Sequence, residues 1–127
     1  MIRDEVERIA AEFSKLFASR DIDALVDMYD SEVKLLAPGA PLIEGRAGVR
    51  TAYEALFAQG AQSLEMETGD VFESGALVVE IGWSTLVIQP AGAEAVRDVS
   101  KYVVVHRRQA DGALKLLVDA FNSDTSS

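Results

Sequence analysis

The spacing of apolar residues changes from a helical period to a strand period near Gly60. Before this glycine, apolar residues recur every three or four positions, which is typical of amphipathic helices. After it, apolar and polar residues alternate, which is typical of strands with one face in water. A run of helices followed by a meander of antiparallel strands predicts an α+β domain with its helices packed on one face of the sheet.

The first half of the chain is expected to hold three helices. The first runs from the N-terminus to about Arg20, and Asp21 is a good N-cap for the second. The apolar face of the second helix is expected to consist of Ile22, Leu25, Val26 and Tyr29. A short strand at residues 33–37 and a proline-containing turn at residues 38–41 come before a third helix at residues 47–58.

The second half is expected to be a sheet. The alternation predicts a strand at residues 64–68, a long strand at residues 77–88, and a closing hairpin of residues 96–106 and 113–122. Asp111-Gly112 is a strong signal for the tight turn that joins the two hairpin strands.

Length and charge restrict the class of protein. The chain has 127 residues, and we expect residues 1–124 to form one domain and residues 125–127 to be a frayed tail. The net charge is −9 and the basic residues are scattered, which argues against nucleic acid or an anionic membrane as a partner. No apolar run approaches the roughly 20 residues that span a bilayer, so we expect a cytoplasmic protein.

The residue types offer no metal or cofactor site. The chain has no cysteine and one histidine, His106, which cannot make a zinc cage. Its acids form no calcium-binding loop, and no glycine-rich nucleotide loop follows a strand. We therefore expect a protein that works without a metal or a cofactor.

The turn at Asp111-Gly112 predicts the register of the closing hairpin. A three-residue loop pairs Gln109 with Ala113, and therefore Val103 with Asp119. One face is then nearly all apolar and should lie against the helices; it includes Tyr102, Val104, His106, Leu116, Val118 and Asn122. The outer face is expected to hold Lys101, Val103, Val105, Leu117, Asp119 and Phe121.

Asp119 is the first candidate functional residue, because a carboxylate in an apolar strand needs an explanation. On this register Lys101 is its diagonal neighbour, and the two could form an ordinary ion pair on the outer face. Alternatively, Asp119 is a functional carboxylate tuned by the nearby ammonium group. The sequence leaves both interpretations open.

Two further titratable residues are candidate catalytic groups. His106 lies late in its strand, where it is either a surface or packing residue or an acid/base that needs a polar partner. Glu80 lies between Val79 and Ile81 in the long strand. It is either an outer-face residue paired with a base or an acid in a pocket.

Four aromatic residues and one amide are candidate ligand-binding residues. Trp83 and Tyr102 lie on neighbouring strands and either fill the core or line a pocket. Tyr53 and Tyr29 lie on apolar helix faces, and their hydroxyls need partners if they are buried. Asn122 ends the apolar hairpin face, where it either orients a ligand or bonds the backbone.

Several segments in order resemble a known superfamily. The segments "RDIDALVDMYDSEVKLLAPGAP", "EGRAGVRTAYEALF" and "SKYVVVHRRQADGALKLLVDAFNSD" are similar to the nuclear-transport-factor-2-like fold, and within it to SnoaL-like proteins and ketosteroid isomerase homologues of unknown function. The resemblance implies a cystatin-like conical half-barrel, with three helices on a curved antiparallel sheet and a pocket between them. It also implies a homodimer through the outer sheet face, with Lys101, Val103, Val105, Leu117, Asp119 and Phe121 at the interface.

The chain departs from the ketosteroid isomerase pattern at two positions. The resemblance implies an Asp base just before a proline-containing turn, and this chain has Ala37 there. It also implies a Tyr donor in the first helix, where the matching residue is Phe13. Both departures argue against isomerase chemistry of that kind.

Two functions remain open. The first is a small-molecule-binding protein with an apolar pocket, working as a cofactor-independent isomerase or lyase, in which Asp119 would be the best base if it faced the pocket. The second is a non-catalytic association domain that dimerises through its sheet. An enclosed cavity that contains two or more titratable groups would favour the first.

Overall fold

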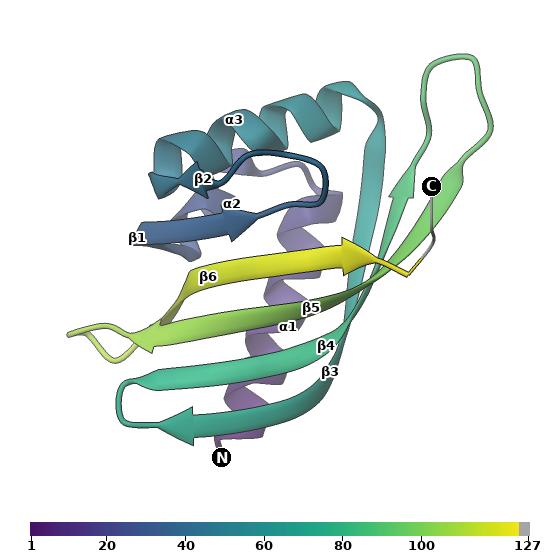
Figure 1. Cartoon of the computed structure of the whole chain (residues 1–127). Helices are drawn as coiled ribbons and strands as arrows, with labels where there is room; N and C mark the ends of the chain where they lie inside the picture. Colours follow the sequence, from purple (N-terminus) through teal and green to yellow (C-terminus); the bar gives the residue numbers. More distant parts are fainter. Residues whose placement is uncertain (125–127) are drawn as a thin grey trace.

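The computed structural model of the protein describes residues 1–124 and places three helices on one face of a six-stranded sheet (Figure 1). The predicted tail at residues 125–127 lies outside the described residues. The helices are α1 (Ile2–Ala18), α2 (Ile22–Asp27) and α3 (Gly45–Ala58). The strands are β1 (Tyr29–Leu36), β2 (Ile43–Glu44), β3 (Ala61–Ser74), β4 (Leu77–Ile88), β5 (Val96–Arg108) and β6 (Leu114–Ser123). The expected α+β fold is confirmed.

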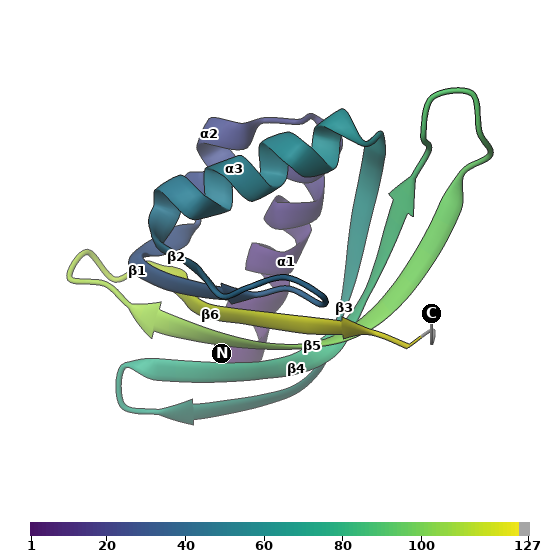
Figure 2. The ribbon, with the colours of Figure 1, turned by 45° about the horizontal axis from the view of Figure 1, so that its top comes forward.

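The strands are ordered β2-β1-β6-β5-β4-β3, and the sheet curves around the helices (Figure 2). Neighbouring strands are antiparallel except β1 and β6, which run parallel. The last strand therefore lies beside the first one in the middle of the sheet, and β2 and β3 are its edges. No helix within residues 1–124 is long and apolar enough to cross a membrane.

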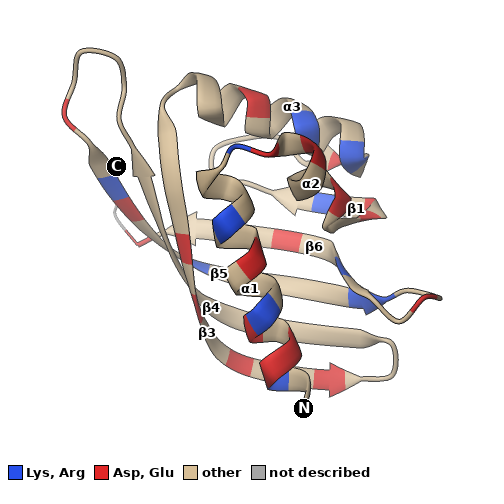
Figure 3. Cartoon of the chain, turned by 180° about the vertical axis from the view of Figure 1, so that it is seen from behind, with Lys and Arg blue, Asp and Glu red and all other residues tan. Residues whose placement is uncertain are grey.

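Helix α1 follows its sequence pattern. Its buried face carries Val6, Ala10, Phe13 and Phe17. Figure 3 shows charged residues of both signs along its length on the side away from the sheet. Helix α2 begins as predicted, because the Asp21 side chain accepts a hydrogen bond from the Ala24 amide.

The prediction that Tyr29 belongs to the second helix is wrong. Helix α2 ends at Asp27, and Tyr29 begins β1 with its side chain fully buried. The Leu116 amide donates to the Met28 carbonyl, and the Arg46 guanidinium donates to the Tyr29 carbonyl at 2.8 Å. Pairing with distant segments thus outweighs the local helical pattern.

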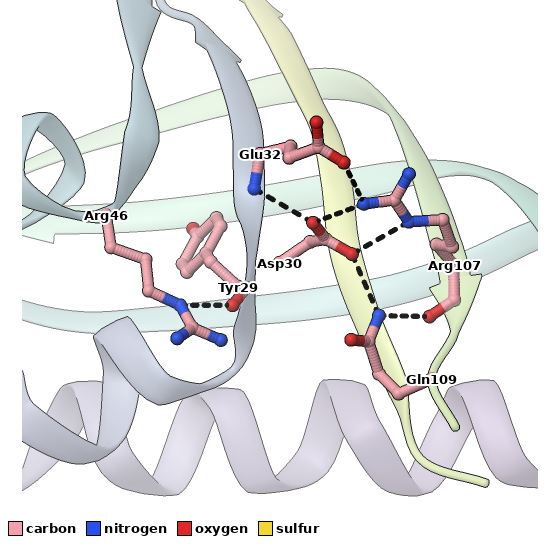
Figure 4. Close-up of polar contacts among 6 residues, drawn as sticks. All are labelled: Tyr29, Asp30, Glu32, Arg46, Arg107 and Gln109. Carbon is pink, nitrogen blue, oxygen red and sulfur yellow. Dashed lines mark hydrogen bonds and ion pairs between the residues drawn. The ribbon is translucent and has the colours of Figure 1, made fainter. Parts of the chain in front are cut away.

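A buried carboxylate anchors β1 to the end of β5 (Figure 4). Asp30 is 1% exposed and accepts hydrogen bonds from the Arg107 guanidinium at 2.7 and 2.9 Å. The Gln109 amide and the Glu32 backbone N–H also donate to it. Burial alone would raise the pKa of Asp30, but these four hydrogen bonds lower it to about 2.

The closing hairpin has the predicted turn but not the predicted faces. The Gln109 amide donates to the Ala113 carbonyl, and Gly112 has a φ of 91°, as the loop requires. The register shifts further along β6. His106 pairs with Leu116, but the next residue of β5, Val105, pairs with Val118. Leu117 therefore has no partner in β5 and forms a β-bulge.

The bulge reverses the faces of the rest of β6. Asp119 lies opposite Val104 rather than Val103, so Asp119 and Phe121 face the helices. Asn122, which was predicted to face inward, is exposed and pairs with Lys101. The predicted outward ion pair between Lys101 and Asp119 is wrong, because Lys101 instead contacts Asp124 at 3.1 Å.

Candidate functional site

A cavity of about 210 Å³ lies between the helices and the concave face of the sheet. Its walls are mostly apolar, with Phe13 and Phe17 from α1 and Leu64 and Met66 from β3. The polar residues that line it are Tyr53, Ser84, Asp98, Ser100, Tyr102 and Asp119. A small apolar cavity with a few converging polar groups is the usual form of a small-molecule site.

Asp119 is one of the two acids that line this cavity, and its orientation results from the bulge at Leu117. The Tyr29 hydroxyl donates to Asp119 Oδ2 at 2.8 Å. Burial raises the pKa of Asp119 to about 6, although the hydrogen bond from Tyr29 acts to lower it. A carboxyl group with this pKa can both accept and release a proton near neutral pH.

Two tyrosines extend the hydrogen bonding from Asp119. The Tyr29 and Tyr53 hydroxyl oxygens lie 2.7 Å apart. Tyr29 is fully buried behind the cavity wall, whereas Tyr53 lines the cavity like Asp119. Burial and the negative charge of Asp119 raise the pKa of both phenols, so both keep their protons.

A second polar cluster surrounds Glu80, which is 1% exposed. Glu80 Oε2 accepts hydrogen bonds from the Tyr102 hydroxyl at 2.6 Å and the Thr68 hydroxyl at 2.8 Å, and Glu80 Oε1 lies 3.1 Å from His106 Nε2. Burial alone would raise the pKa of Glu80, but the hydrogen bonds from His106, Tyr102 and Thr68 lower it. Within residues 1–124, no group of three or more His, Asp and Glu side chains could hold a metal ion.

The structure selects among the alternatives that the sequence left open for Glu80 and His106. Glu80 points inward rather than to the outer face, and His106 is buried and paired with it. His106 Nδ1 is buried with no partner in the described part of the chain. Neither Glu80 nor His106 lines the cavity, but Tyr102 does. Glu80 therefore orients a cavity-lining phenol and does not itself reach the ligand space.

Trp83 and Tyr102 lie on opposite faces of the sheet. Trp83 pairs with Lys101 and is 46% exposed, whereas Tyr102 pairs with Gly82 and is buried. The structure thus brings Tyr53, Tyr102 and Asp119 to one cavity and leaves Trp83 outside it.

The sequence interpretation missed three polar residues of the cavity. Ser84, Asp98 and Ser100 line it, and Asp98 accepts a hydrogen bond from the Ser123 hydroxyl at 2.6 Å. Counting back by twos from Tyr102 along its strand leads to Ser100 and then to Asp98. That alternation could have identified both residues.

The two departures from the ketosteroid isomerase pattern also lie in this cavity. Phe13 and Ala37 both line it. The positions where the resemblance implies a donor and a base are therefore at the same cavity, but here they carry no functional group. The titratable groups come instead from β5, β6 and α3.

The outer face of the sheet carries a row of exposed apolar side chains. Ile81, Trp83, Val99 and Val103 are each between 38% and 46% exposed. Of the residues predicted for an interface, Lys101, Val103 and Val105 lie on this face, but Asp119 and Phe121 do not. Because of the bulge, β6 contributes Val118 and Ala120 to the outer face, where they pair with Val105 and Val103.

The chain belongs to the SnoaL-like domain family, whose profile matches residues 10–116. No curated protein sequence matches the chain. Among solved structures it is similar to a nuclear-transport-factor-2-like protein with a cystatin-like fold from Novosphingobium aromaticivorans, with a TM-score of 0.80 and 20% identity over 98% of this chain and 83% of that chain. It is also similar to a ketosteroid isomerase-like protein from Erwinia carotovora atroseptica, with a TM-score of 0.82 and 17% identity over 94% of each chain.

A third similar structure is a candidate calcium/calmodulin-dependent protein kinase type II association domain from Thiobacillus denitrificans. Its TM-score is 0.75, with 19% identity over 94% of each chain. At these identities the likeness establishes the fold alone. The resemblance to SnoaL-like proteins of the nuclear-transport-factor-2-like superfamily is confirmed.

Proposed function

We propose that the protein binds a neutral, largely apolar small molecule in the cavity and transfers a proton on it, as an isomerase or a lyase would, with Asp119 as the base. The observation that carries this proposal is the position of Asp119 on the wall of an apolar cavity with its pKa raised to about 6. A carboxylate in such a position destabilises the folded protein, which is a common feature of functional sites.

The charge of the lining favours a ligand without negative charge. Asp98 and Asp119 are the charged side chains among the lining residues, and the lining includes no Lys, Arg or His. An anionic ligand would lie beside two carboxylates without a compensating base. A neutral ring compound with one carbonyl or hydroxyl oxygen fits both the apolar walls and the polar groups.

The chemistry that suits these residues is proton abstraction beside a carbonyl group. Ionised Asp119 would accept the proton from carbon, and protonated Asp119 would return it to another atom of the ligand. Tyr102 donates its proton to Glu80, so its phenolic oxygen is free to accept a hydrogen bond from a ligand hydroxyl. The serine hydroxyls of Ser84 and Ser100 can donate to a ligand oxygen.

The test uses exchange of carbon-bound protons, because it needs no knowledge of the natural substrate. A panel of cyclic ketones in deuterated water is followed by NMR with and without protein. We expect protein-dependent loss of the α-protons of at least one ketone, lowered about a hundred-fold or more in Asp119→Asn. No protein-dependent exchange with any ketone, or equal exchange by Asp119→Asn, contradicts the proposal.

Self-association through the outer sheet face is the second candidate, and it is favoured by the exposed row of Ile81, Trp83, Val99 and Val103. An apolar patch of this kind usually marks a contact surface. We expect a dimer by light scattering at micromolar concentration, and a monomer for Val103→Glu. Thr51→Glu, on the exposed side of α3, is the matched control and should remain dimeric. A monomeric wild-type protein would rule out this candidate.

A further inference from the structure

A chain of hydrogen bonds runs from the Asp119 carboxyl group through the Tyr29 hydroxyl to the Tyr53 hydroxyl, and it begins and ends at the cavity. Asp119 bonds to Tyr29, and Tyr29 bonds to Tyr53. Both end members line the cavity, whereas the middle member is fully buried and does not. The Asp119–Tyr29–Tyr53 chain therefore connects two places on one cavity wall through a group that a ligand cannot touch.

The direction of the hydrogen bonds in this chain follows from the ionisation of Asp119. An ionised carboxylate only accepts, so Tyr29 must donate its single proton to Asp119. Tyr29 then has no proton left for Tyr53, and Tyr53 must donate to Tyr29. In this state Tyr53 offers only lone pairs to the cavity.

Protonation of Asp119 permits the opposite direction. A proton on Asp119 Oδ2 can be donated to the Tyr29 oxygen, which frees the Tyr29 proton for Tyr53 and the Tyr53 proton for the cavity. The change needs only rotation of two hydroxyl groups, because the heavy atoms already lie at hydrogen-bond distance. We propose that protonation of Asp119 reverses the Asp119–Tyr29–Tyr53 chain, so that Tyr53 becomes a hydrogen-bond donor to a ligand oxygen.

The other titratable groups around the chain leave this direction to Asp119. They are Glu80 on β4 and Asp98, Tyr102 and His106 on β5. The Tyr102 proton and His106 Nε2 are both engaged with Glu80, and Asp98 bonds to Ser123. None of these groups bonds to Tyr29 or Tyr53 in the described part of the chain.

The switch gives the site a donor at the moment that the reaction needs one. When Asp119 takes a proton from carbon, negative charge develops on the carbonyl oxygen of the ligand. The same proton uptake makes the Tyr53 proton available to that oxygen. The inference rests on the proposed function, because it assigns a role to Tyr53 in the same site. Tyr53 would favour ligands whose oxygen lies near α3.

The first measurement is NMR of protein with tyrosine labelled by carbon-13 at Cζ, titrated across the range where Asp119 ionises. The Cζ signal of Tyr53 is expected to shift with the Asp119 carboxyl signal. In Tyr29→Phe the carboxyl still titrates, but the shift at Tyr53 should be largely lost. Tyr102→Phe is the matched control, because Tyr102 lines the cavity outside the chain, and it should retain the shift. A full-sized Tyr53 shift in Tyr29→Phe, or none in the wild type, overturns the switch.

The second measurement compares acetophenone with α-methylstyrene, which has the same shape but no carbonyl oxygen. Affinity for acetophenone should rise about five-fold as Asp119 becomes protonated, the factor that a typical hydrogen bond gives. Tyr53→Phe and Tyr29→Phe should lose this gain, and α-methylstyrene should never show it. If Tyr29→Phe keeps the gain, Asp119 itself is the donor and the switch is wrong. If acetophenone does not bind, the Cζ titration decides alone.

These measurements follow hydrogen bonds and binding, whereas the ketone exchange experiment follows turnover. Exchange that depends on Asp119 without a reversal at Tyr53 would leave the proposed function intact and remove the switch. A reversal at Tyr53 without any ketone exchange would support the switch and contradict the proposed function.

Discussion

The Tyr29 hydroxyl donates to Asp119 across 2.8 Å, and no other side chain within residues 1–124 hydrogen-bonds that carboxylate. One hydrogen bond compensates little of the cost of burying a charge. Asp30 is also buried, but it accepts four hydrogen bonds, and its pKa falls to about 2 instead of rising to about 6. Four donors offset the cost of burial for the carboxylate that holds the fold, whereas one donor does not offset it for the carboxylate in the cavity.

We expect Asp119→Asn to stabilise the protein at about pH 8 by about 2 kcal/mol, because the folded-state pKa is raised. Because the pKa of Asp119 is raised in the folded state, the wild-type protein becomes more stable as pH falls through about 6 towards the pKa of Asp in the unfolded chain. The asparagine variant lacks this rise, so the advantage should shrink by about pH 5. Urea unfolding at several pH values measures it. A pH-independent difference between the two proteins would contradict the prediction.

We expect Asp30→Asn to destabilise the protein by about 2 kcal/mol, a value reduced from that of a fully buried pair because Arg107 is partly exposed. Because the pKa of Asp30 is lowered, its contribution to the stability of the folded protein is complete above about pH 4 and is lost as pH falls towards about 2. Chemical unfolding and an acid titration followed by circular dichroism measure both effects. Glu32→Gln is the matched control, because Glu32 contacts the same guanidinium but is 71% exposed. Equal losses in the two variants would show that burial of Asp30 is not the cause.

We expect Glu80→Gln to cost about 2 kcal/mol, because an amide cannot accept hydrogen bonds from Tyr102, Thr68 and His106 together. Urea unfolding measures the loss, provided that the dependence of the unfolding free energy on urea concentration is unchanged. Glu67→Gln, on the exposed side of the neighbouring strand, should leave stability nearly unchanged. A Glu80 variant as stable as the Glu67 variant would mean that the cluster around Glu80 is not formed.

We expect Gly82→Ala to cost about 3 kcal/mol, because a Cβ there would lie 2.4 Å from the Glu67 carbonyl oxygen and 2.6 Å from the Tyr102 hydroxyl oxygen. The backbone of β3 cannot move aside easily, so the Tyr102 phenol should leave Glu80. Thermal unfolding and the Tyr102 ring signals in NMR measure both results. Gly48→Ala is the control, since its Cβ would meet the Ile43 side chain at 2.7 Å, which can rotate away. Unperturbed Tyr102 signals in Gly82→Ala would contradict the prediction.

The elements and the turn were predictable from local signals. Periodicity located the three helices and five of the six strands approximately, but it missed β2 and the start of β1. Asp111-Gly112 determined the pairing of the residues next to the turn. The bulge at Leu117 was not predictable, because the alternation of Leu114, Leu116 and Val118 continues through it without interruption. A single unpaired residue therefore reversed the interpretation of Asp119.

The polar clusters of the site depend on contacts between distant residues, which a single sequence does not reveal. Glu80 and His106 are 26 residues apart, and Tyr29 and Asp119 are 90 residues apart. Each residue alone has an ordinary explanation as a strand or helix residue. The surrounding fold gives them partners. Of the cavity residues that the sequence interpretation missed, only Ser100 and Asp98, on the inward face of β5, could have been predicted from the alternation along the strand.

The pairing of β1 with β6 has a consequence for how the chain folds. Tyr29 on β1 and Asp119 on β6 lie 90 residues apart, and strands that distant pair slowly because the intervening chain must first be ordered. On the ribosome, β6 emerges after every other strand of this sheet, so until then β1 can pair only with β2. Asp119 thus arrives with the segment that completes the sheet, and a chain synthesised only as far as β5 contains Asp98 but not yet Asp119.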